Sequence, residues 1–216
     1  MRVVKQADVR KNEILDAADA LFAEKGFDGA STDDILKAVG IARGTLYHHF
    51  KSKEDIMDAL IERYAARLLS GAQAIAGDKS VPVEERMMRT ILALRVEHYS
   101  ETGGKEMIGH LHKPQNALMH QKIQRVMMHG IPPILAGILE EGIAQGLFYT
   151  PYPLECMEMT VAYLDTVFDN AMFELADDQR ILRIEAFIFH LEKMLSAPAG
   201  RFAYVAQMFE NGHGAG

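Results

Sequence analysis

The 216-residue chain contains one cysteine, Cys156, and no tryptophan. A single cysteine excludes a framework of internal disulfides and is typical of a reducing compartment. No apolar run approaches the ~20 residues that span a bilayer, and the first ten residues are polar, so neither a membrane span nor a signal peptide is expected. No segment shows the alternating pattern of a half-buried strand. These absences favour an all-α protein of the cytoplasm.

Acidic residues are absent between Ile35 and Lys53, although the whole chain carries a formal net charge of −7. Net acidity by itself argues against nucleic-acid binding. Residues 1–53, however, contain nine basic and eight acidic side chains, so the acidic excess lies in the rest of the chain. A local basic surface on an acidic protein can still neutralise a few phosphates.

The same stretch predicts two short helices joined by a tight turn. Ser31 is a good N-cap, and Asp34 follows three residues later at the reciprocal position of a capping box. A first helix is expected over residues 32–39, and Gly40 can adopt the left-handed conformation that the turn requires. A second helix is expected over residues 43–50. This is the pattern of a helix-turn-helix.

The second helix has a donor-rich outer face. Leu46 and Phe50, at i and i+4, point inward and leave slim or polar residues outside. A helix that enters the major groove reads base edges with its N-terminal residues. Arg43 could donate to a guanine or a phosphate, whereas the flanking lysines fit phosphates. We predict DNA contacts from Thr32, Arg43, Gly44, Thr45, Tyr47, His48, Lys51 and Lys53.

Helical spacing of apolar residues recurs along the rest of the chain. A helix over residues 8–25 precedes the helix-turn-helix, and a long connecting helix over 52–75 follows it. Pro132-Pro133 predicts a kink or a new helix start, because proline removes a donor and clashes with the preceding turn. Further helices are expected over residues 83–101, 105–112, 116–129, 134–146, 154–175 and 180–196.

The last two of these helices carry apolar residues on more than one face, which usually means that both faces are buried. One chain supplies a partner for only one face, so a second subunit is expected to cover the other in a two-fold four-helix bundle. The predicted dimer interface consists of Val161, Leu164, Phe168, Met172, Ile184, Phe187, Ile188 and Leu191.

Methionine and histidine gather in the middle of the chain. Methionine usually fills gaps in a core, but a Met-lined cavity also adapts to varied apolar ligands. Arg95 and His98 share a helical face and could orient such a ligand. The predicted effector pocket comprises Ile91, Leu94, Arg95, His98, Met107, Leu111, Met119, Ile123, Met127 and Phe168.

The central histidines also suggest a metal sensor, but their spacing argues against it. His110 and His112 do not share a helical face, and no cysteine or i, i+4 histidine pair lies nearby. We therefore expect no metal and no cofactor. The alternative interpretation is that these histidines are polar groups that line or cap a pocket: His98, His110, His112, His120 and His129.

Residues 10–56 resemble the N-terminal domain of the TetR family of bacterial transcriptional regulators. The matching positions are Ile14, Ala17-Ala18, Leu21-Phe22, Gly26-Phe27, Ser31, Ile35, Gly40, Gly44-Thr45-Leu46-Tyr47, His49-Phe50 and Lys53-Glu54. Ala42 departs from the pattern, because a capping Ser is common there. This change weakens the start of the recognition helix by ~1 kcal/mol.

The resemblance implies a homodimer that binds double-stranded operator DNA and a small-molecule effector. Its implied fold is all-α: a helix-turn-helix DNA-binding domain over residues 8–68, with the helix-turn-helix itself at 31–50, a helical effector-binding and dimerisation domain over 69–197, and a tail over 198–216. An inverted-repeat operator and a repressor located at the nucleoid in the cytoplasm are expected.

Two other classes of protein are alternatives to a ligand-responsive repressor. An enzyme is disfavoured because the sequence has no Gly-rich phosphate loop, nucleophile elbow, Cys–His pairing or His-Glu-x-x-His pattern. A DNA-binding regulator controlled by a partner protein would share every N-terminal feature. It differs from a ligand-responsive repressor only in whether small molecules release it from DNA.

Overall fold

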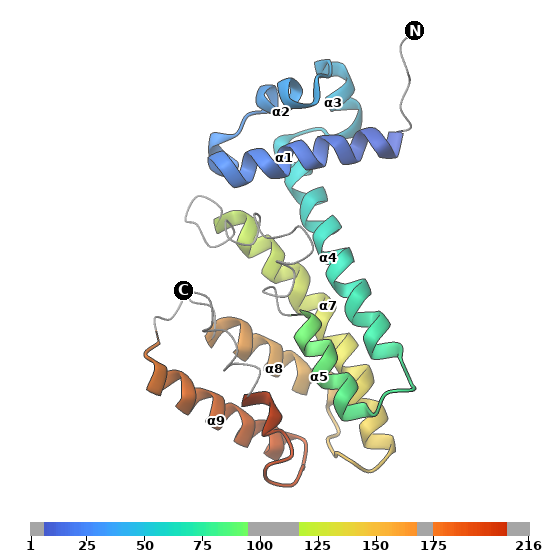
Figure 1. The fold of residues 1–216 in the computed structure, drawn as a ribbon, viewed down its shortest axis with the longest axis vertical. Helices are drawn as coiled ribbons and strands as arrows, with labels where there is room; N and C mark the ends of the chain where they lie inside the picture. Colours follow the sequence, from blue (N-terminus) through green and yellow to red (C-terminus); the bar gives the residue numbers. More distant parts are fainter. Residues whose placement is uncertain (1–6, 95–116, 168–174, 207–216) are drawn as a thin grey trace. The chain divides into compact units, whose positions relative to one another are not determined.

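The computed structural model describes residues 7–94, 117–167 and 175–206, and every regular element in these ranges is an α-helix (Figure 1). The all-α prediction is therefore confirmed. The helices are α1 (Ala7–Gly29), α2 (Thr32–Val39), α3 (Arg43–His49), α4 (Lys53–Gly77), α5 (Val83–Leu94), α7 (Ala117–Ala144), α8 (Pro153–Val167) and α9 (Asp177–Met194).

Capping fixes both ends of α2 as the sequence predicts. The Ser31 hydroxyl accepts a hydrogen bond from the Asp34 amide at 3.1 Å, and the Asp34 carboxylate accepts one from the Ser31 amide at 3.0 Å. The Ser31 hydroxyl also donates to the Asp34 carboxylate at 2.7 Å, and this bond, followed by the one from the Ser31 amide, lowers the pKa of Asp34 to about 2. Gly40 takes the left-handed conformation (φ 70°), and its amide donates to the Leu36 carbonyl. Backbone hydrogen bonds thus fix the turn that sets the direction of α3.

The ends of the other helices lie within four residues of the predicted bounds where the structure describes them, and α1 runs on from residue 25 to Gly29 with non-helical geometry at Gly26 (φ 75°). α3 ends at His49, one residue early, and Ala42 supplies no side-chain cap, as its methyl group requires. Ser52 precedes α4 and accepts a hydrogen bond from the Asp55 amide at 3.0 Å. The helix predicted over residues 105–112, and the ends of those predicted to reach 101 and 175, lie outside the described residues.

A new helix start at Pro132-Pro133 is not found, because α7 continues through both prolines. Packing explains the difference. Leu135, Ile138 and Leu139, in the turns that follow, are at most 3% exposed. Their burial offsets the backbone hydrogen bonds that two prolines remove.

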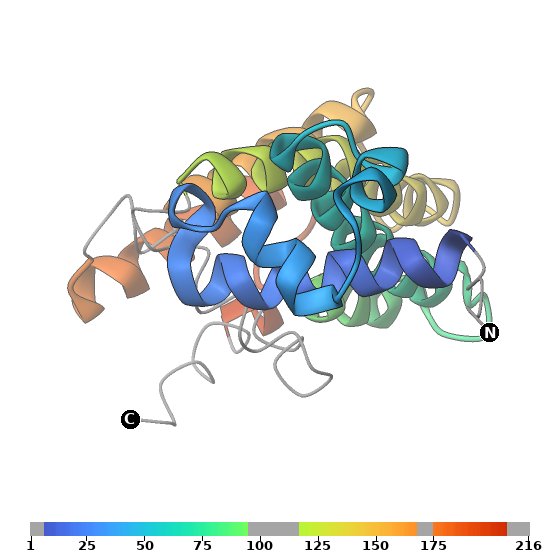
Figure 2. The same cartoon turned by 90° about the horizontal axis from the view of Figure 1, so that it is seen from above.

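The chain divides into two compact units. In the described residues, the first comprises 7–67 and 117–126, and the second comprises 68–94, 127–167 and 175–206. The first unit holds α1, α2 and α3, with α2 packed on α1 and α3 following it (Figures 1 and 2). Its core contains Ile14, Leu15, Ala18, Phe22, Phe27, Ala30, Ile35, Leu46, Phe50, Ile56, Met57, Leu60, Ile61 and Met119.

The second unit has its own core, built on α5, the later part of α7, α8 and α9. Phe148 and Phe202 stack at its centre with ring centroids 5.5 Å apart. Gly142 makes room for this pair, because a Cβ there would stand 2.5 Å from the Phe148 ring. The packing of the Phe148 ring against α7 therefore depends on a glycine inside that helix.

Candidate functional site

The inner face of α3 anchors it to the first core. Leu46 is 1% exposed and packs in the same cluster as Ile14, Ile35 and Ile56. Phe50, immediately after the helix, is also buried there. With one face committed to the core, the opposite face of α3 must point to solvent.

That outer face carries most of the predicted DNA contacts. Arg43, Gly44, Tyr47 and His48 are exposed, and Thr45 is half-buried. Nothing lies within 4 Å of a Cβ built on Gly44, so this position leaves open space at the N-terminal end of the helix. Two further predicted residues, Thr32 on α2 and Lys51 after α3, are half-buried and exposed respectively. A short helix thus presents donors next to a slim residue.

Arg43 makes an ion pair that the sequence did not indicate. Its Nη2 donates to Oδ1 of Asp33 at 2.6 Å, and both side chains remain more than half exposed. The Asp33 carboxylate raises the pKa of Arg43, first by hydrogen bonding and then by its charge. The guanidinium therefore stays charged and is held between the first turns of α2 and α3.

The structure gives Lys53 a different role from the predicted phosphate contact. Its ammonium donates to the carbonyl oxygens of Phe27 (2.7 Å) and Ala30 (3.0 Å) and lies 4.3 Å from the centre of the Phe27 ring. The last carbonyls of a helix have no partner within it. Lys53 bonds one carbonyl in the last turn of α1 and one just after it, so it joins the start of α4 to the end of α1.

A Lys53→Met variant should therefore lose ~2 kcal/mol of unfolding free energy, because two charge-assisted hydrogen bonds disappear while the apolar stem is kept. Denaturant unfolding of the full chain measures the loss. Lys51→Met is the matched control, since Lys51 is exposed, and it should change stability by less than ~0.5 kcal/mol. If Lys53→Met is as stable as the wild type and binds every DNA sequence more weakly, Lys53 contacts phosphate as the sequence predicts.

Polar contacts also join α4 to α1. The Tyr64 hydroxyl donates to Asp19, and Arg63 donates to Asp16 at 2.7 Å. Burial, followed by the hydrogen bond to Asp19, raises the pKa of Tyr64. In the same unit, Lys122 at the start of α7 pairs with Asp58 of α4. The connecting helix is thus fixed to the helices around it by named contacts.

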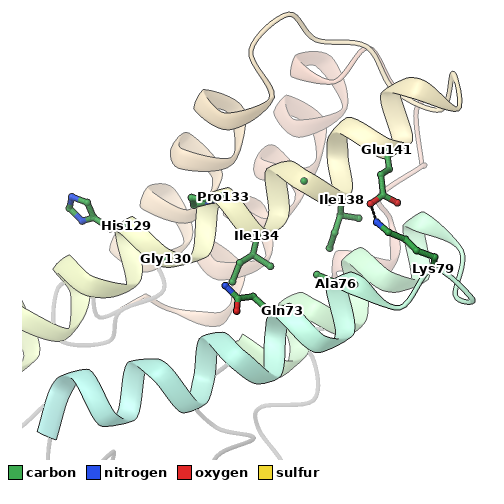
Figure 3. A pocket seen from close by; sticks show the side chains of 11 residues that line it. Gln73, Ala76, Lys79, His129, Gly130, Pro133, Ile134, Ile138 and Glu141 are labelled. Carbon is green, nitrogen blue, oxygen red and sulfur yellow. Dashed lines mark hydrogen bonds and ion pairs between the residues drawn. The ribbon is translucent and has the colours of Figure 1, made fainter. Parts of the chain in front are cut away.

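A cavity of about 510 Å³ lies between α4 and α7 in the second unit (Figure 3). Lys79 and Glu141 form an ion pair at one end, and His129 lies at the other. Glu141 also accepts from Arg86, which is 2% exposed and donates to the Ala76 carbonyl at 2.9 Å. The lining residues are Gln73, Ala76, Gly77, Lys79, His129, Gly130, Pro133, Ile134, Gly137, Ile138 and Glu141.

The residues predicted to form a pocket do not line this cavity. Met119 is 2% exposed in the core of the first unit, and Ile123 packs against that core. Ile91 and Leu94 pack against the core of the second unit, and Met127 is half-buried. The sequence placed Met119 and Ile123 in a pocket because apolar spacing does not tell which core a helix face joins. Arg95, His98, Met107, Leu111 and Phe168 lie outside the described residues.

The residues predicted for the dimer interface mostly face the chain's own core. Ile184, Phe187 and Leu191 are 6–7% exposed within one chain. Val161, Leu164 and Ile188 pack beside them, while Phe168 and Met172 lie outside the described residues. Other apolar side chains of these two helices are exposed instead: Leu154, Met159 and Tyr163 on α8, and Ile181, Leu182 and Phe189 on α9.

Within residues 7–94, 117–167 and 175–206, no three His, Cys, Asp or Glu side chains are grouped so that they could hold a metal ion. In those same ranges, no helix combines the length and the hydropathy needed to cross a membrane. His98, His110 and His112 lie outside them.

Comparisons with known proteins match both parts of the chain. Residues 14–60 match the family described as bacterial regulatory proteins of the tetR family, and residues 101–197 match the tetracyclin repressor-like C-terminal domain. The first match includes the whole of α2 and α3. The second match includes the whole of α7, α8 and α9.

Individual relatives agree with these matches. The chain is 32% identical over 148 residues to the fatty acid metabolism regulator protein of Bacillus subtilis, which covers 66% of this chain and 73% of that protein. It is 37% identical over 83 residues to the transcriptional repressor KstR2 of Mycobacterium tuberculosis, covering 38% of this chain but only 42% of that repressor's length.

The fold is also similar to a solved structure, that of FadR from Bacillus subtilis in complex with stearoyl-CoA. The TM-score is 0.51 at 24% identity, and the likeness covers 87% of this chain and 98% of that one. The capped helix-turn-helix, the two family matches and the B. subtilis relative all agree. The chain belongs to the TetR family of bacterial regulatory proteins and is a transcriptional regulator rather than an enzyme.

Proposed function

We propose that the protein is a homodimeric repressor that binds an inverted-repeat operator in the cytoplasm and leaves it when a small, largely apolar effector binds. The observation that carries this proposal is the exposed, donor-rich outer face of α3, held by a capped turn on a buried inner face. Exposed polar side chains on a short, rigid helix are what major-groove recognition requires.

In this proposal, Arg43 reads a base edge or a phosphate, and Gly44 and Thr45 allow close approach. The DNA backbone is contacted by Thr32, Tyr47, His48 and Lys51. Lys53 is not among the proposed contacts, because its ammonium binds carbonyls of the protein itself. Two-fold symmetry then sets the centres of the two half-sites ~34–36 Å apart, or a multiple of that distance.

The second subunit is proposed to cover the exposed apolar side chains of α8 and α9. Leu182 is 65% exposed, Ile181 57% and Phe189 54%. Apolar side chains gathered on neighbouring helices are unusual on a monomer and mark an interaction surface. Ile184, Phe187 and Leu191, which the apolar spacing predicts at the interface, would then support this surface from inside the chain.

The cavity between α4 and α7 is proposed as the effector site. Its volume of about 510 Å³ is within the range of small-molecule sites, ~300–1,000 Å³. Pro133, Ile134 and Ile138 supply an apolar wall, and charged groups stand at the Lys79 end. An apolar body with a polar end would suit this lining, and the stearoyl-CoA bound by FadR has that character.

An effector here would act through α4, because this helix lines the cavity near its C-terminal end and only three residues separate its start from the end of α3. A ligand changes DNA binding only by favouring one arrangement of α4 and α7 over another. The contacts of Tyr64 and Arg63 with α1 would carry a change in α4 to the helix-turn-helix.

A Gly137→Leu variant should lose effector binding at least about tenfold while keeping operator affinity, since its side chain would occupy part of the cavity and clash with a bound effector. A Cβ on Gly137 meets nothing within 4 Å, so the helix itself tolerates the change. Gly71→Leu is the matched control: Gly71 is also an exposed helix glycine with open space, and it lies outside the cavity lining.

The measurement is the shift in unfolding temperature and in operator affinity on adding stearoyl-CoA, with coenzyme A alone as reference, followed by a broad compound library. Equal responses from wild type and Gly137→Leu would move the effector site elsewhere. If no compound changes either quantity for the wild type, ligand control is wrong and control by a partner protein is favoured.

A further inference from the structure

An exposed ion pair joins the first turns of α2 and α3. Asp33 is the second residue of α2, and its Oδ1 accepts the 2.6 Å hydrogen bond from Nη2 of Arg43, the first residue of α3. The side chains are 65% exposed for Arg43 and 56% for Asp33. Exposed pairs contribute little to stability, and buried Ile35 and Leu46 already hold the two helices together. The Asp33–Arg43 ion pair is therefore better explained by a role in function than by a contribution to folding stability.

Its position places a negative charge on a surface that otherwise favours anions. The free amides at the start of a helix attract phosphate, and Thr32 stands at the first position of α2. Asp34, in the same turn, is engaged in the capping box with Ser31. Asp33 takes no part in that box, and its carboxylate instead faces the arginine proposed to contact DNA. A phosphate approaching Arg43 would also approach this carboxylate, and like charges repel.

Arg43 can nevertheless serve a base while it remains bonded to Asp33. A guanidinium has five N–H donors in a planar fork, and the bond to Asp33 uses Nη2. That bond takes one of the two Nη2 hydrogens, so the other, with the parallel hydrogen on Nη1 or Nε, is left for acceptors such as the O6 and N7 atoms of a guanine. A neutral base edge with two acceptors does not repel the carboxylate as a phosphate does.

We propose that Asp33 is a specificity determinant that keeps Arg43 from binding phosphates of random DNA and reserves it for a base edge in the operator. This inference rests on the proposed function, because it requires α3 to face DNA. Asp33 acts through Arg43 and is thus a positioning residue. It weakens non-specific binding more than specific binding, and so widens the gap between them.

The test compares wild type, Asp33→Asn, Arg43→Ala and the double variant on two DNA probes. One probe is a sequence that the wild-type full chain selects from a random pool, and the other is unselected DNA. Asp33→Asn should lower the ratio of the two affinities about tenfold, since each subunit of a dimer loses one repulsive charge. On unselected DNA its salt dependence should steepen by about two phosphate contacts per dimer.

Asp33→Asn should act only when Arg43 is present, so it should not change the affinity ratio in the Arg43→Ala background. Glu62→Gln, which removes an exposed charge on α4, controls for net charge and should leave the ratio unchanged. An unchanged ratio and salt slope for Asp33→Asn would overturn this inference alone. A wild type that fails to enrich any sequence would instead overturn the proposed function.

Discussion

In an Arg43→Ala variant, affinity for the selected operator should fall about a hundredfold, while affinity for random DNA should fall far less. Each guanidinium contact with a base edge contributes ~1–3 kcal/mol of discrimination, and a dimer has two of them. The expected loss comes from the surface alone, because Arg43 is exposed and its partner Asp33 is exposed as well. Fluorescence anisotropy titrations on both probes give the two losses.

Lys37→Ala is the control for this experiment, since Lys37 is an exposed cation of the same helix-turn-helix that is not among the proposed contacts. It should leave the ratio of operator to random affinity near its wild-type value. Equal losses on both probes for Arg43→Ala would assign Arg43 to a phosphate and remove it from base reading.

A Leu182→Glu variant should raise the dissociation constant of the dimer by about a thousandfold or more, and operator binding should fail with it. The two-fold axis brings in two copies of the new charge, and burying an unpaired carboxylate in an apolar interface costs several kcal/mol. Leu182 is 65% exposed in one chain, so the subunit fold should survive the substitution. Sedimentation over a range of protein concentrations measures the dissociation constant.

Tyr149→Glu is the matched control, because Tyr149 is 67% exposed in the loop after α7 and belongs to neither α8 nor α9. It should remain dimeric. If Leu182→Glu also sediments as a wild-type dimer, the exposed side chains of α8 and α9 do not form the subunit interface.

The helix-turn-helix could be predicted closely from the sequence because its determinants are local. Ser31, Asp34 and Gly40 act on backbone groups within four residues, so their identities suffice to place α2 and its turn. The inner face of α3 follows from i, i+4 spacing, and Leu46 is indeed buried. The family matches confirm the function that this segment indicated.

The remaining site residues depend on long-range packing that spacing does not encode. Lys53 looks like any exposed cation after a basic helix, yet it binds carbonyls 23 and 26 residues away. Met119 has the same apolar signature as a pocket residue but joins the first core. In α9, Ile184, Phe187 and Leu191 are buried within the chain, whereas Ile181, Leu182 and Phe189 are exposed. The cavity could not be predicted from the sequence, because part of its lining is glycine, such as Gly137, which has no side chain to give an apolar pattern.

We propose that two copies of this chain bind one inverted repeat through α3. Native mass spectrometry of the full chain with its selected DNA tests it most directly, using the intact repeat and a version with one half-site scrambled. We expect two chains on each intact repeat and a large loss of affinity when either half-site is scrambled. One chain on each site, or equal binding to intact and scrambled repeats, would contradict it.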